Sequence, residues 1–106
     1  QSETDEGLFL LAGRGSSAMG YPIDKDCFLV LKGSRIAPDV TSGLPQNYVE
    51  QRKTLLEIGI VQSNVFTEDY VFTSASAAAS IILGRSSNGR REWAKLDGRT
   101  LAQFGH

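Results

Sequence analysis

The apolar residues of this chain come in short runs, none longer than five residues. The two longest runs cover residues 8–12 and 27–31, and a glycine follows each of them within two positions. A run of this length fits one buried strand, whereas a membrane-spanning helix needs roughly 20 apolar residues. We therefore expect a domain built from short elements and no transmembrane segment.

The chain has 106 residues, of which 41% are apolar and 22% are charged. This is the composition of a globular protein, and the length suits one domain with one core. We expect a linker or disordered tail at 1–7, a single α+β domain at 8–104 and a tail at 105–106. Because the chain starts at Gln1 instead of Met, we expect it to be either processed or, as we favour, a piece of a longer protein.

Short apolar segments predict the strands. The runs 8–12 and 27–31 are predicted to pair in antiparallel fashion, and the second is expected to be central because it is apolar on both faces. Residues 13–22 between them are predicted to be a loop, since glycine, serine and proline interrupt this segment. Two further short strands are expected at 60–62 and 65–67.

Two helices and a C-terminal hairpin complete the prediction. One helix is expected at 45–57, and a second at 75–83 with Ser74 as its N-cap. The hairpin is expected at 92–104, around an Asp-Gly turn. The predicted fold class is α+β, with a small, mostly antiparallel sheet, and by analogy the helices and hairpin resemble a winged helix.

The sequence offers little for catalysis. Residues 13–18 match the dinucleotide fingerprint in its G-x-G-x-x-A form, but Gly20 and Pro22 follow before a helix could begin, so we read the match as chance. Cys27 lies in an apolar run, and His106, the single histidine, is the last residue. A nucleophile needs a neighbouring base, so we expect no catalytic residues, no metal, no cofactor and no enzyme activity.

Positive charge is concentrated near the C-terminus. Residues 85–99 carry a local charge of +3, whereas the rest of the chain carries −4. A basic cluster in an otherwise acidic domain is typical of a surface that binds phosphate, although a solvated loop has the same composition. The candidate nucleic-acid contacts are Arg85, Asn88, Arg90, Arg91 and Lys95.

Weaker candidates lie elsewhere in the sequence. Ser74 and Ser76 open the predicted helix 75–83, where free N–H groups and the helix dipole attract anions; a plain helix cap is the alternative. Lys32, Ser34 and Arg35 follow the strand expected to be central. We include all five as candidate phosphate contacts.

Two large side chains have more than one interpretation. Trp93 lies inside the basic segment and either stacks on a base or belongs to the core, and we favour the core. Arg52 falls inside the apolar stripe of helix 45–57, where a guanidinium must snorkel, pair with a carboxylate or reach a ligand. We expect a structural ion pair, with Asp69 as the partner. The stripe consists of Tyr48, Val49, Leu55 and Leu56.

Several segments together resemble a known accessory domain. They are 28–34 (FLVLKGS), 55–60 (LLEIGI), 72–79 (FTSASAAA), 83–89 (LGRSSNG) and 97–101 (DGRTL), together with Arg52 and Trp93. The pattern resembles the domain of unknown function at the C-terminus of GIY-YIG nuclease and restriction–modification proteins, itself similar to the restriction-enzyme adenine-methylase-associated (RAMA) domain. The chain departs from that pattern at Ala75, where proline is frequent, and at Arg90, where the RAMA pattern has an aromatic residue.

The resemblance implies a non-catalytic module of a DNA-processing protein that binds DNA, including modified DNA. We expect it to do so in the cytoplasm, through its basic C-terminal face. The alternative is a protein-interaction domain that docks a nuclease or methylase subunit through its small-residue helix 75–83.

Overall fold

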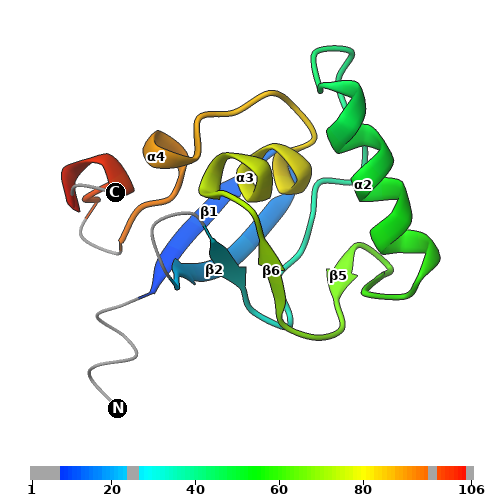
Figure 1. Ribbon diagram of the computed structural model, residues 1–106, viewed down its shortest axis with the longest axis horizontal. Coiled ribbons are helices and arrows are strands. Elements are labelled where there is room, and N and C mark those ends of the chain that lie inside the picture. The colour runs from blue at the N-terminus through cyan, green and yellow to red at the C-terminus, as the bar shows by residue number, and fades with distance from the viewer. Residues whose placement is uncertain (1–7, 24–26, 96–97, 105–106) are drawn as a thin grey trace.

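Residues 8–23, 27–95 and 98–104 are described in the computed structural model of the chain (Figure 1). A four-stranded antiparallel sheet has the order β1-β2-β3-β6, and its strands are β1 (Phe9–Gly13), β2 (Ser16–Pro22), β3 (Phe28–Val30) and β6 (Tyr70–Phe72). A separate hairpin joins β4 (Val61–Gln62) to β5 (Val65–Phe66). The helices are α2 (Gln46–Glu57), α3 (Ala75–Leu83), α4 (Gly89–Glu92) and the 3-10 helix η1 (Leu101–Phe104).

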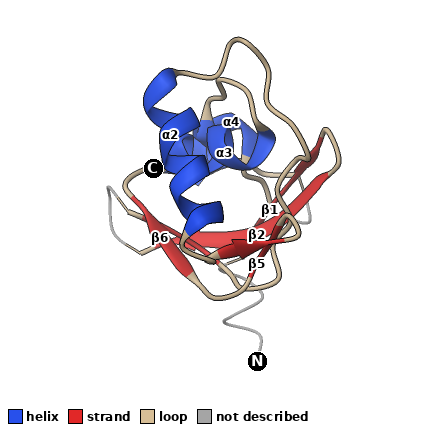
Figure 2. Cartoon of the chain, turned by 90° about the vertical axis from the view of Figure 1, so that its right-hand side faces the viewer, coloured by secondary structure: helices blue, strands red, loops and turns tan. Residues whose placement is uncertain are grey.

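The predicted α+β class is confirmed. The three α-helices lie on the same side of the four-stranded sheet (Figure 2). Among the described residues, no helix combines the length and apolar character that crossing a bilayer requires. The tails predicted at 1–7 and 105–106 lie outside the described residues.

The prediction of a loop over 13–22 is wrong, because β2 occupies this segment and lies between β1 and β3. Its residues alternate between buried and exposed, as a strand with one covered face requires. Gly20 faces inward, and a Cβ there would lie 2.3 Å from the Leu29 carbonyl oxygen and 2.7 Å from the Phe28 ring. The glycine that suggested a loop therefore lets the strand pack, and β3 is central as predicted.

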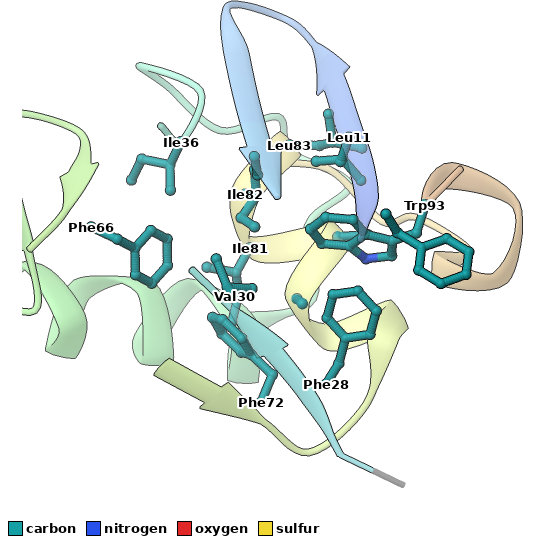
Figure 3. Close-up of a cluster of buried hydrophobic side chains, with 14 of the residues drawn as sticks. Leu11, Phe28, Val30, Ile36, Phe66, Phe72, Ile81, Ile82, Leu83 and Trp93 are labelled. Carbon is teal, nitrogen blue, oxygen red and sulfur yellow. The ribbon is translucent and has the colours of Figure 1, made fainter. Parts of the chain in front are cut away.

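Helix α3 forms the middle of the core. Ser74 is its N-cap as predicted, its Oγ accepting a hydrogen bond from the Ala77 N–H at 3.0 Å, and Gly84 ends it at φ 76°. Residues 77–83 are all buried, and the helix contacts all four strands of the sheet. The aromatic and aliphatic side chains of the sheet fill the space beneath it (Figure 3).

Among the described residues, the predicted C-terminal hairpin is reduced to one short antiparallel contact. Ala94 and Thr100 form an isolated bridge, and the Leu101 N–H donates to the Trp93 carbonyl beside it. Glu92 ends α4, and 101–104 form η1 instead of the predicted returning strand. Trp93 and Leu101 are buried, and they draw this segment toward the core instead of along a ribbon. The winged-helix-like arrangement, which relied on the hairpin as its wing, is not confirmed.

Candidate nucleic-acid interface

Helix α4 is a single turn fixed against the beginning of α3. The Gly89 N–H donates to Ser76 Oγ at 2.9 Å, and the Trp93 indole N–H donates to the Ala75 carbonyl at 3.1 Å. A Cβ on Gly89 would lie 2.2 Å from the Ala75 carbonyl carbon, so the two backbones touch only because this residue is glycine. Asn88 caps the turn, since its Oδ1 accepts from the Arg90 N–H at 3.0 Å.

The predicted phosphate seat at Ser74 and Ser76 is not supported. Ser74 Oγ caps α3 through the Ala77 N–H, and Ser76 Oγ holds Gly89. Ser74 therefore serves α3 itself, whereas Ser76 serves the junction where α4 packs against this end of α3. The plain capping alternative is the one that the geometry favours.

Trp93 is a core residue, as favoured from the sequence. Its side chain is fully buried, and its ring centroid lies 4.4 Å from that of Phe28 (Figure 3). An indole with no exposed surface is not available for stacking on a nucleic-acid base. Its role is to anchor the chain directly after α4.

Five basic residues on α4 and its flanking segments form the group that we call the basic strip: Arg85, Arg90, Arg91, Lys95 and Arg99. Arg90 and Arg91 are exposed, and no ion pair joins either of them to another described residue. Lys95 lies with its ammonium 5.5 Å from the centre of the Phe9 ring, and its N–H donates to the Arg99 carbonyl. Arg85 pairs with Glu92, so the strip contains both engaged and available cations.

The comparison with known protein families covers nearly all of this structure. A family model described as a domain of unknown function (DUF4357) matches residues 8–105, which include the sheet, the helices and the basic strip. The chain belongs to this family. No curated protein and no solved structure matches it.

The DUF4357 fold does not bring Lys32, Ser34 and Arg35 to the basic strip. Ser34 is buried, and its Oγ exchanges hydrogen bonds with the Met19 backbone. Arg35 bridges to Val65 in β5, which lies on the other side of α3 from α4 (Figure 1). Lys32 and Arg35 are exposed, but they belong to a different part of the DUF4357 surface.

The prediction that Arg52 pairs with Asp69 is wrong. Arg52 is 7% exposed and donates to two carbonyl oxygens, that of Ile81 at 2.8 Å and that of Ala37 at 2.5 Å. Burial lowers the pKa of its guanidinium, while the nearby Asp39 opposes that shift. Asp69 instead accepts a hydrogen bond from the Lys32 N–H at 2.7 Å.

A second arginine, which the sequence did not single out, supports the same helix end. Arg14 donates to the Leu83 carbonyl at 2.6 Å and pairs with Asp39 at 2.9 Å. Because the last carbonyls of a helix lack partners within it, Arg52 and Arg14 both stabilise the C-terminus of α3. Neither arginine is a candidate for ligand binding.

The strands contribute no charged side chain to the face of the sheet that is turned away from the helices. No strand of the sheet contains an acidic or basic residue, and the register places Leu10 beside Met19, and Leu29 beside Tyr21 and Val71. Met19 and Val71 remain 40% and 46% exposed. We call these five residues the open sheet face. Sequence reasoning missed it because β2 and β6 were not predicted.

Across the described segments, no three His, Cys, Asp or Glu side chains come together as metal ligands would. Within the described part of this DUF4357 domain, we consider the basic strip and the open sheet face as candidate binding surfaces.

Proposed function

We propose that this domain is a non-catalytic module that binds the phosphate backbone of DNA through the basic strip. The observation that carries the proposal is the state of Arg90 and Arg91, which are exposed on a rigidly anchored turn and have no ion pair within the described chain. Arginine side chains held in this way suit phosphate, because a guanidinium binds its oxygens in bidentate fashion. The resemblance to accessory domains of GIY-YIG nuclease and restriction–modification proteins points in the same direction.

Contact with phosphate is favoured over recognition of bases. Asn88 Oδ1 caps α4, and Trp93 is buried, so the residues best suited to read or stack on a base are engaged in the fold. Adjacent helical residues point about 100° apart, which suits Arg90 and Arg91 to two separate phosphates. We therefore propose binding with little sequence preference, in contrast to recognition of a modified base.

The test is fluorescence anisotropy with a labelled duplex at several salt concentrations. We expect Arg90→Glu to weaken binding by about ten-fold or more, and Lys53→Glu, an equal charge change at an exposed site on α2, to have a much smaller effect. Up to five phosphate contacts give a log–log salt slope of roughly −4 to −5. A slope near zero, or equal losses in the two variants, would contradict the proposal.

A second candidate function is docking of a nuclease or methylase subunit. The observation that favours it is the open sheet face, which combines exposed Met19 and Val71 with an absence of charge from the strands. Exposed apolar patches of this kind mark protein interfaces. The docking surface differs from the one expected from the sequence, since helix α3 is buried and presents its small residues to the core.

A further inference from the structure

Arg85 differs from the two α4 arginines because an acidic neighbour already holds it. Its Nη2 lies 3.3 Å from Glu92 Oε2, and its Nη1 donates to Ser87 Oγ, also at 3.3 Å. The Arg85 side chain is 41% exposed and that of Glu92 is 29% exposed, so solvent reaches both groups. Glu92 follows Arg91 directly, which puts this ion pair beside the residues proposed to contact phosphate.

We propose that Glu92 occupies the place of a nucleic-acid phosphate on Arg85, and that the phosphate displaces it when DNA binds. This inference rests on the proposed function. A carboxylate and a phosphate offer the same kind of paired oxygen acceptors to a guanidinium, so one replaces the other without a change in the arginine. In the free domain Arg85 is paired with Glu92, and it contacts phosphate only when DNA binds. Glu92 therefore lowers the affinity of the basic strip for DNA.

The geometry favours such an exchange. A charge-assisted hydrogen bond between arginine and a carboxylate is normally about 2.7–2.9 Å long, and this one is longer. Ion pairs that remain in contact with solvent contribute little to stability, so breaking the pair does not endanger the fold. Ser87 Oγ keeps Arg85 near its present position, because it also donates to the Arg85 carbonyl at 2.9 Å.

The main experiment compares Glu92→Gln with Glu57→Gln, a matched change at an exposed position of α2. Both variants remove one negative charge, but only Glu92→Gln releases Arg85. Binding to a labelled duplex should become roughly five-fold tighter in Glu92→Gln and less than two-fold tighter in Glu57→Gln. The salt slope of Glu92→Gln should stay close to that of the wild-type domain, because phosphate contacts Arg85 in both complexes. Glu92→Ala serves as the second variant.

A double-mutant cycle separates release of Arg85 from simple loss of charge. In an Arg85→Gln background, Glu92→Gln should change the affinity by less than two-fold, because no guanidinium is there to release. Equal gains in the two backgrounds, or no gain in the wild-type background, would overturn the inference and leave the proposed function standing. Failure of the wild-type domain to bind the duplex at low salt would overturn both.

Discussion

At the scale of single residues, an arginine inside an apolar stripe proved to be part of the packing. Arg52 lies on the buried side of α2 with Leu55, and it reaches the carbonyls of Ile81 and Ala37. The sequence indicated that this charge was buried, because its position on the helix follows from a period of 3.6 residues. The acceptors were not predictable, since they are main-chain atoms supplied by distant segments of the fold.

Replacing Arg52 tests this structural role. Arg52→Leu should lower the free energy of unfolding by about 2–4 kcal/mol, because two buried carbonyls lose their donor. Lys53→Leu, a change at the exposed neighbouring position, should alter it by less than about 0.5 kcal/mol. Urea denaturation measures both values. An Arg52→Leu domain as stable as wild type would show that the guanidinium is not needed to satisfy these carbonyls.

At the scale of secondary-structure elements, local signals account for what was predictable. A continuous apolar run predicted β3, and an N-cap serine with a terminal glycine predicted α3. The missed elements depend on distant contacts. β2 needs Gly20 against the Phe28 ring, and α4 needs Gly89 against the α3 backbone, so neither element follows from its own segment alone.

Gly89 gives this dependence a direct test. Gly89→Ala should push α4 away from α3, because the added Cβ would lie 2.2 Å from the Ala75 carbonyl carbon. We expect a loss of about 1–3 kcal/mol in the free energy of unfolding and weaker DNA binding, since the α4 arginines move with the turn. Gly43→Ala is the matched control, because its Cβ would lie 3.7 Å from Thr41 Oγ1, an ordinary van der Waals contact. Unchanged stability and affinity in Gly89→Ala would contradict a fixed α4.

At the scale of the whole molecule, the two candidate surfaces lie on different sides of the sheet. Helix α4 is on the side that carries the helices, and the open sheet face is turned away from them (Figure 2). The sequence predicted the basic strip because its members lie within 15 consecutive residues. The open sheet face could not be predicted from the sequence, because it combines residues as far apart as Leu10 and Val71 and depends on the register of the strands.

This separation predicts that the two binding activities can be removed independently. Met19→Lys combined with Val71→Lys puts charge on the open sheet face, and because both side chains are exposed the fold should tolerate it. Capture of a separately expressed nuclease or methylase subunit by the immobilised domain should fall at least ten-fold, whereas Arg90→Glu should leave it intact. Ile58→Lys, at a 63% exposed apolar position on the end of α2, controls for added charge. Undiminished capture by the double variant would exclude this face as the docking surface. An equal loss of capture in Ile58→Lys would show that added positive charge, wherever it lies, weakens capture.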